Sequence, residues 1–217
     1  MVRTSASGPC LAAEKRLGWN CIAIEAASHL ADRLERNRRL SGATFEIRRS
    51  AVWKTDGERI TFHTDASFHV GGHLDTVAGY PDGSKLRIRE SVETVTVDTL
   101  VREWKEEHAD PARIVIKLDI EGAETAAFAG ARKTLADGAI LIYEDHGSDT
   151  ECQTTKAALE LGLIVFALET GSIARISSPA EARARKPNWR LGYNFVALRP
   201  EYESLLDDVK SETADVS

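Results

Sequence analysis

Cysteine is scarce in this chain of 217 residues, and the positions of the few cysteines exclude two kinds of small scaffold. Cys10, Cys21 and Cys152 are far apart and odd in number, and no CxxC pair occurs. A disulfide framework or a zinc knuckle needs paired cysteines at characteristic spacings, so neither is indicated. We therefore expect a protein of the reducing cytoplasm.

Long apolar runs and an excess of positive charge are also absent. No stretch approaches the roughly 20 apolar residues that span a bilayer, and residues 1–9 lack the apolar core of a signal peptide. The 28 basic and 34 acidic residues give a net charge of −6, which argues against broad electrostatic binding to nucleic acid or to an anionic membrane. We expect neither a membrane span nor a nucleic-acid partner.

Hydrophobic residues form 42% of the chain, which is enough for a sizeable core. We expect one domain over residues 1–200 and a polar C-terminal tail over residues 201–217. Strand and helix patterns alternate along the domain, which indicates an α/β fold with a parallel sheet and right-handed crossovers. Strands are predicted at 21–25, 45–53, 59–63, 92–97, 113–119, 139–143, 163–168 and 193–198, and helices at 9–17, 28–40, 99–107, 123–136 and 150–161.

Local signals refine this pattern. A turn at Thr55-Asp-Gly57 predicts that 59–63 returns as the hairpin partner of 45–53, and Asp98 is placed to cap the helix from 99. The last two strands have no clear helix between them, so they could pair antiparallel at a sheet edge. Residues 64–91 are polar and predict a long loop.

The segment from Ile114 to Glu124 is the most informative, because an apolar strand runs directly into three carboxylates, Asp119, Glu121 and Glu124. In open α/β sheets, ligands bind beyond the carboxyl ends of such strands. Clustered acids cost stability unless a ligand, a cation or a hydrogen-bond network compensates them. The alternative is that Glu121 and Glu124 only favour the positive N-terminus of the next helix.

Acids end two further strands, at Glu25 and Glu144. In a doubly wound sheet these ends and that of Asp119 share one edge. An acid after the second strand of such a fold is suited to a ribose, because a carboxylate can accept bonds from two hydroxyl groups. A solvent-facing Glu25 is the alternative interpretation.

Together, these features resemble the FkbM family of S-adenosylmethionine-dependent methyltransferases. The segment Lys117-Leu-Asp-Ile-Glu-Gly-Ala-Glu124 is similar to the most distinctive motif of that family, and Gly130-Ala131 follows as its Gly-Ala pair. Ala23-Ile-Glu25 resembles the ribose strand, and Ser50-Ala-Val52 resembles the strand on the adenine side. The resemblance covers about residues 5 to 200.

This resemblance implies a class I methyltransferase (Rossmann-like) fold, with a doubly wound sheet that is mostly parallel and has an antiparallel edge strand. It implies S-adenosylmethionine as the cofactor and methyl transfer to a hydroxyl group of a sugar, a glycolipid or another small-molecule acceptor. By position, it assigns cofactor contacts to Gly8, Glu25, Ala51 and Asp119.

The chain departs from the family at its N-terminus. The family begins with a strand that ends in Asp-hydrophobe-Gly-Ala-Asn-x-Gly. Matching Gly8 to the last glycine puts Thr4 at the first glycine, Val2 at the aspartate and most of the strand upstream of Met1. We therefore expect the first strand to be largely missing and the N-terminus to be shortened.

Methyl transfer to an alcohol needs a base for the hydroxyl proton. By position, Asp119 and Glu121 could orient or deprotonate the acceptor, or hold the positive end of the cofactor. His146 follows the strand that ends at Glu144 and is a second base candidate, since imidazole titrates near neutrality. The alternative is that His146 is an ordinary surface residue.

A metal site is weighed and not expected. His63, His69 and His73, with Asp65 and Asp75, have no recognised metal-ligand spacing and predict a solvated loop.

Two other functions stay open. A non-catalytic remnant, acting as a binding or scaffold protein, would explain the incomplete cofactor loop. A nicotinamide-dependent dehydrogenase could also use Glu25, but the chain lacks a GxGxxG turn.

Overall fold

The computed structural model describes residues 2–3, 8–65, 73–74, 87–108, 113–120 and 122–207. These form two compact units, one from Met1–Ala109 and Lys117–Ala131 and the other from Asp110–Ile116 and Arg132–Ser217. Both parallel and antiparallel strand pairs occur, so the expected mixed α/β class is confirmed.

Parallel strands form the first sheet of unit 1. Its strand order is β8 (Val115–Leu118), β1 (Val2–Arg3), β2 (Ile22–Glu25) and β3 (Glu46–Arg49). β2 is buried along its whole length, as its uninterrupted apolar sequence predicts. β1 pairs parallel with β2, with Val2 opposite Ile22, so two residues of the expected first strand lie within the chain.

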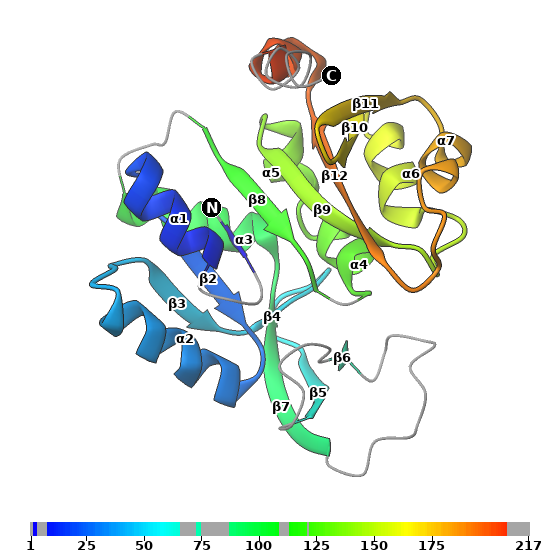
Figure 1. The fold of residues 1–217 in the computed structure, drawn as a ribbon. Helices are drawn as coiled ribbons and strands as arrows, with labels where there is room; N and C mark the ends of the chain where they lie inside the picture. Colours follow the sequence, from blue (N-terminus) through cyan, green and yellow to red (C-terminus); the bar gives the residue numbers. More distant parts are fainter. Residues whose placement is uncertain are drawn as a thin grey trace. The chain divides into compact units, whose positions relative to one another are not determined.

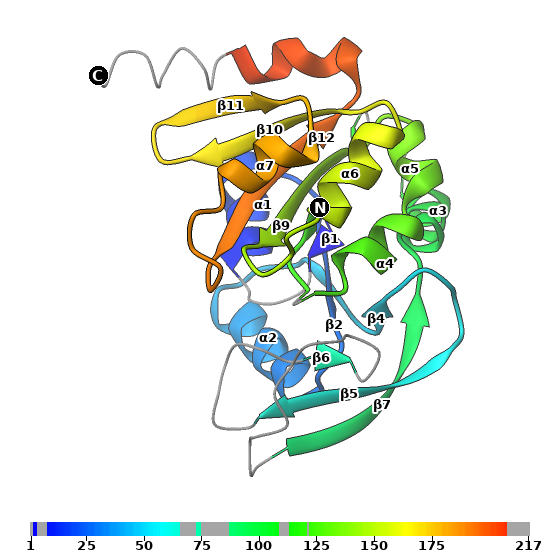
Figure 2. The ribbon, with the colours of Figure 1, turned by 90° about the vertical axis from the view of Figure 1, so that its right-hand side faces the viewer.

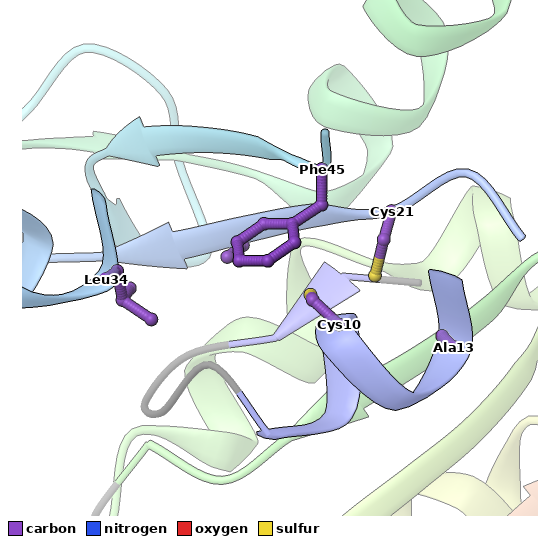
Figure 3. Close-up of a cluster of buried hydrophobic side chains, with 6 residues drawn as sticks. Cys10, Ala13, Cys21, Leu34 and Phe45 are labelled. Atoms are coloured by element: carbon purple, nitrogen blue, oxygen red, sulfur yellow. The ribbon is translucent and has the colours of Figure 1, made fainter. Parts of the chain in front are cut away.

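Two helices lie beside these strands (Figure 1), and both contribute side chains to one small buried core. α1 (Gly8–Leu17) and α2 (Ser28–Leu40) match the predicted helices closely. Figure 3 shows Cys10 of α1 and Cys21 before β2 with their sulfurs turned toward each other, beside the ring of Phe45. All three are buried, and the thiols here act as small apolar side chains.

A second sheet in unit 1 corrects two predictions. Its order is β4 (Ala51–Val52), β7 (Arg87–Val95), β5 (Arg59–Asp65) and β6 (His73–Leu74). The strand predicted at 45–53 is split at Ser50. The N–H of Ser50 still donates to the carbonyl of Glu25 at the end of β2, but the next two residues, Ala51 and Val52, pair with β7. The predicted hairpin is wrong, because β5 pairs antiparallel with β7 instead (Figure 2). β7 also begins within the predicted 64–91 loop.

The helices that close unit 1 begin and end differently from the prediction. α3 (Val97–Glu107) is capped by Thr96, whose side chain accepts from the N–H of Thr99, so the predicted cap at Asp98 is wrong. The predicted helix at 123–136 is broken into α4 (Glu124–Ala129) and α5 (Arg132–Ala136), and α5 belongs to unit 2.

Gly130 lies at this break and ends α4. A Cβ at Gly130 would lie 2.3 Å from the carbonyl oxygen of Trp53. The Gly130 carbonyl also accepts the N–H of Asp98 at the start of α3. The backbone at Gly130 therefore packs directly on two other segments.

Unit 2 is built on antiparallel pairs. Its strand order is β11 (Ser172–Ile176), β10 (Ile164–Glu169), β12 (Gly192–Leu198), β9 (Ile140–His146) and β8. The predicted antiparallel pairing of the last two strands is confirmed, since β10 pairs antiparallel with β12. The edge of the unit is β11, a strand that was not predicted from the sequence.

Helices and a short 3-10 segment complete unit 2. α6 (Gln153–Glu160) packs on β10, and α7 (Pro179–Ala184) contacts β11 (Figure 1). The 3-10 segment η1 (Pro200–Leu206) packs Tyr202 and Leu206 against Ile164 and Phe166. Part of the predicted polar tail is thus anchored on the core. Within the described residues, no helix is long and apolar enough to cross a membrane.

Candidate functional site

Glu25 ends β2 with its carboxylate buried. Only 5% of the residue is exposed, and its Oε1 accepts the N–H of Ala27 at 3.0 Å. Ala27 is the residue before α2, so this bond ties the carboxylate to the β2–α2 connection. The orientation of the Glu25 carboxylate is therefore set by the backbone that follows it.

Asp119 lies just beyond β8 and forms an ion pair. Its Oδ2 accepts from Lys117 Nζ at 2.9 Å, and the two side chains are 18% and 15% exposed. Lys117 is the charged residue inside the otherwise apolar strand, so this pair explains how β8 accommodates it. Glu121, which is predicted beside Asp119, lies outside the described residues.

Glu124 has a structural role in this turn. Its carboxylate accepts the N–H groups of Ile120 and Gly122, each at 2.8 Å. Gly122 has a φ of +93°, which a residue with a side chain rarely adopts. Glu124 thus closes the turn into α4, which agrees with the alternative of a carboxylate that favours the start of the helix.

One apolar cluster follows the ends of both β2 and β8. Ala26 and Ala27 come directly after Glu25, Ile120 comes directly after Asp119, and all three belong to the cluster. We name it the alanine cluster; its residues are Ala26, Ala27, Leu30, Ala51, Trp53, Ile60, Val92, Ile120, Ala123 and Ala126. The structure therefore brings the two strand ends that carry Glu25 and Asp119 to one place, with the predicted adenine-side residue Ala51 in the same cluster.

Glu90 of β7 occupies the start of α2, which the sequence reading missed. Its carboxylate accepts from the backbone N–H of Ser28 at 3.2 Å and from Ser28 Oγ at 2.8 Å. The same carboxylate is paired with Arg49 at the end of β3. No local signal marks Glu90, because Ser28 lies 62 residues away in the sequence.

Gly8 is the first residue of α1. A Cβ added there would meet nothing within 4 Å, so no close contact in the described structure requires a glycine. Thr4 and Ser5, at the expected glycine loop, lie outside the described residues. A cofactor contact by Gly8 remains a prediction.

His146 lies at the end of β9 in unit 2, with an exposed side chain. Its Nδ1 accepts the N–H of Ser148 at 3.2 Å and lies 2.7 Å from Ser148 Oγ. Because a backbone N–H can only donate, Nδ1 is the acceptor, and a neutral ring carries its proton on Nε2. In this arrangement Nε2 donates and does not accept.

A buried ion pair lies beside His146. Lys186 Nζ donates to Asp145 Oδ1 at 2.7 Å, to the His146 carbonyl at 3.1 Å and to the Asp149 carbonyl at 2.6 Å. Burial raises the pKa of Asp145, while the Lys186 ammonium opposes this shift. Burial also raises the pKa of the Cys152 thiol, so it stays protonated near neutrality.

One group of possible metal ligands occurs among the described residues, and it does not include His63, His69 or His73. Glu46, Glu107 and His108 have ligand atoms within 4.8 Å of one another. His108 Nε2 lies 3.5 Å from Glu46 Oε1, and its ring stacks on Trp104. This contact between a ring nitrogen and a carboxylate oxygen does not require a metal. The side chains of the predicted histidine loop lie outside the described residues.

The described strands and helices form a mixed α/β fold, which is consistent with a methyltransferase. Residues 6–169 match the family described as the methyltransferase FkbM domain. Since this match covers more than half of the chain, the protein belongs to the FkbM methyltransferase family. A comparison with curated proteins found no match.

Proposed function

We propose that this protein is an S-adenosylmethionine-dependent O-methyltransferase that acts on a hydroxyl group of a sugar, a glycolipid or another small-molecule acceptor. The observation that carries the proposal is the meeting of the Glu25 and Asp119 strand ends at the alanine cluster in a member of the FkbM family. A mostly apolar surface with a few placed polar groups is the usual composition of a small-molecule site.

We further propose that the sheet has the class I methyltransferase arrangement. In support, unit 1 has the strand order β8-β1-β2-β3, in which β1 and β3 flank β2. In unit 2, β9 lies beside β8, and β12 runs antiparallel between β9 and β10. β8 contributes residues to both units, and the family motif begins within it at Lys117 and continues into the loop that follows.

The residues present fit the adenosine half of the cofactor. Glu25 offers a buried carboxylate that can accept bonds from ribose hydroxyls in addition to the Ala27 N–H, because its two oxygens have about four acceptor sites. Ala51 and its mostly buried apolar neighbours in the alanine cluster would contact adenine. Asp119 offers a negative charge suited to the positive end of the cofactor. Gly8 remains a candidate cofactor contact beside the predicted N-terminal glycine loop.

When bound, S-adenosylmethionine would supply an electrophilic methyl group on its sulfonium sulfur, and the acceptor hydroxyl would lose its proton as its oxygen takes that methyl group. The chain must then accept the hydroxyl proton. We assign this role to Asp119 or Glu121, with His146 as the second candidate. Since Nδ1 is the accepting nitrogen of His146, a proton would have to reach it on the side of Ser148.

Calorimetry with S-adenosylmethionine and with S-adenosylhomocysteine tests the proposal. We expect the wild-type protein to bind both, and Glu25→Gln to weaken binding about tenfold, or about 1.4 kcal/mol, because one charged acceptor for the ribose is lost. Glutamine keeps an oxygen for the Ala27 N–H, so the fold should be retained. Glu160→Gln changes an acid whose side chain is 67% exposed and should leave affinity unchanged. No heat with the wild-type protein at millimolar ligand would contradict the proposal.

The second candidate is a binding or scaffold protein that has lost the cofactor. Two observations favour it: Thr4 and Ser5 replace the family's small loop residues, and Glu90 already bonds the first N–H of α2. The same titrations separate the two, because this candidate binds neither ligand.

A further inference from the structure

His29 is an unsatisfied buried side chain at the start of α2. Both ring nitrogens, Nδ1 and Nε2, are buried, and no described residue gives either of them a hydrogen-bond partner. The rest of the residue is partly exposed. Buried polar atoms in folded proteins are nearly always bonded, so a histidine with neither nitrogen bonded needs an explanation.

The polar groups nearest in sequence are already committed to one another. Ser28 gives both its backbone N–H and its hydroxyl to Glu90, and Glu90 is also paired with Arg49. The Oε1 of Glu25 accepts the N–H of Ala27. These bonds hold the β2–α2 connection together without using the imidazole.

His29 also lies within the segment that forms the candidate site. It follows Glu25 by four residues, and its neighbours Ala26, Ala27 and Leu30 all belong to the alanine cluster. The chain thus presents a buried acid, an apolar cluster and an unsatisfied imidazole within one short connection between a strand and a helix.

We propose that His29 is a binding residue for the nucleoside half of S-adenosylmethionine, an inference that rests on the proposed function. A neutral imidazole has one N–H donor and one acceptor nitrogen. Adenosine presents hydroxyl groups and an amino group as donors, and hydroxyl oxygens and ring nitrogens as acceptors. A bound nucleoside can therefore satisfy a ring that the chain leaves unsatisfied.

The variant His29→Leu gives the decisive test, because two measurements should move in opposite directions. Without ligand, we expect a urea midpoint equal to or above that of the wild type, since leucine removes two unsatisfied polar atoms. With S-adenosylhomocysteine and with adenosine, we expect at least tenfold weaker binding by calorimetry. His29→Gln, which keeps a donor and an acceptor, should restore part of the affinity and serves if the leucine variant does not fold.

His108→Leu is the matched control. The His108 ring is bonded, because its Nδ1 lies 3.1 Å from the Trp104 carbonyl, to which it must donate. The same substitution should therefore lower the urea midpoint and leave ligand affinity unchanged.

The outcomes separate the two proposals. If the wild type binds but His29→Leu binds equally well, the inference on His29 is overturned and the proposed function stands. A lower urea midpoint for His29→Leu means that the ring is satisfied within the folded chain, which also overturns it. If the wild type binds neither ligand, both proposals fail.

Discussion

Lys186 is a buried charge in unit 2 with all of its hydrogen-bonding capacity used. Its ammonium has three donors, and three acceptors surround it: Asp145 Oδ1 and the carbonyls of His146 and Asp149. The other Asp145 oxygen accepts from Thr155 Oγ1 at 3.1 Å. A complete network of this kind fixes the end of β9 and the loop that begins at His146.

Removing the ammonium should therefore be costly. We expect Lys186→Met to lower the free energy of unfolding by about 3 kcal/mol near neutral pH, because Asp145 stays buried without its counter-charge. Urea unfolding at a series of pH values measures this. Lys156→Met, at a side chain that is 61% exposed and 4.0 Å from Glu160, should cost under about 0.5 kcal/mol.

The pH dependence of this deficit has a definite sign. Without Lys186, the folded-state pKa of Asp145 rises further above its unfolded value of about 3.9. A carboxyl group with a raised folded pKa takes up a proton on folding as the pH falls, which favours the folded state. The deficit should be largest at high pH and shrink as the pH falls through the raised folded-state pKa of Asp145; a deficit that grew on acidification would contradict this account.

At the scale of single residues, the sequence identifies a candidate site residue when its position next to a recognisable element marks it. Glu25 and Asp119 are recognisable because each directly follows an apolar strand. The partners Lys186 and Asp145 are 41 residues apart, and no local pattern connects them. Asp98 failed as the predicted cap because Thr96, two residues earlier, already bonds the N–H of Thr99.

At the scale of elements, Asp56 links the β4–β5 turn to the start of α3. It accepts from the N–H of Thr96 at 2.7 Å and from Thr99 Oγ1 at 2.9 Å. Burial alone would raise the pKa of Asp56, but the hydrogen bonds from Thr96 and Thr99 outweigh it and lower the pKa. The turn therefore supplies a second cap to the helix.

We expect Asp56→Asn to lower the free energy of unfolding by about 1 kcal/mol at pH 7. Because the folded pKa is lowered, the stabilisation is complete above the unfolded value of about 3.9 and is lost as the pH falls through the folded value. The difference from wild type should shrink between pH 5 and the lowest pH at which both proteins are folded, as measured by urea unfolding. Asp137→Asn, at an exposed turn residue, is the control and should change the free energy of unfolding by less than about 0.5 kcal/mol at pH 7.

The break between α4 and α5 depends on the glycine at 130. We expect Gly130→Ala to destabilise the protein by about 2 kcal/mol, because the new Cβ overlaps the Trp53 carbonyl oxygen and the backbone has to shift. Thermal unfolding measures this loss. Gly8→Ala, where a Cβ has open space, should change stability by less than about 0.5 kcal/mol, and an equal effect of the two would contradict the steric explanation.

Elements with a clear local pattern of apolar residues and end signals were predicted well, and those that depend on tertiary partners were not. α1, α2, β2 and β10 agree with their predicted ranges to within two residues. The split of the 45–53 strand could not be predicted, because it depends on where the segment stops pairing with β2, at the bond from the Ser50 N–H to the Glu25 carbonyl. For α7, which was not predicted, the sequence does contain a helix-start signal. The Ser178 hydroxyl accepts the N–H of Glu181, and the Glu181 carboxylate accepts the N–H of Ser177.

At the scale of the whole molecule, the segment that matches the family ends before the last elements of the folded structure. The match stops at residue 169, where β10 ends. β12, which follows it, lies between β9 and β10 and pairs with both. The matched segment is therefore not a structural unit.

We expect a chain of residues 1–169 to lose cooperative unfolding and to bind an apolar dye, because β9 and β10 would lack the strand between them. A chain of residues 1–207 retains every described element and should unfold like the full-length protein. Circular dichroism melts and dye fluorescence compare the two. Cooperative melting of the shorter chain would show that β12 is dispensable.

At this largest scale, the alternation of patterns was sufficient for the α/β class, and one motif was sufficient for the family. The division into two units was not predicted, because β8 contributes residues to both and no linker marks a boundary. The expected domain over 1–200 and tail over 201–217 remain predictions.

The position of β12 also governs how the protein is made. Ribosomes release a chain from its N-terminus, and β9 and β10 emerge before the strand that must come to lie between them. Until residues 192–198 leave the exit tunnel, the edges of β9 and β10 that later pair with β12 have no partner strand. They could then pair with a neighbouring nascent chain. A newly synthesised molecule should therefore depend on chaperones late in translation.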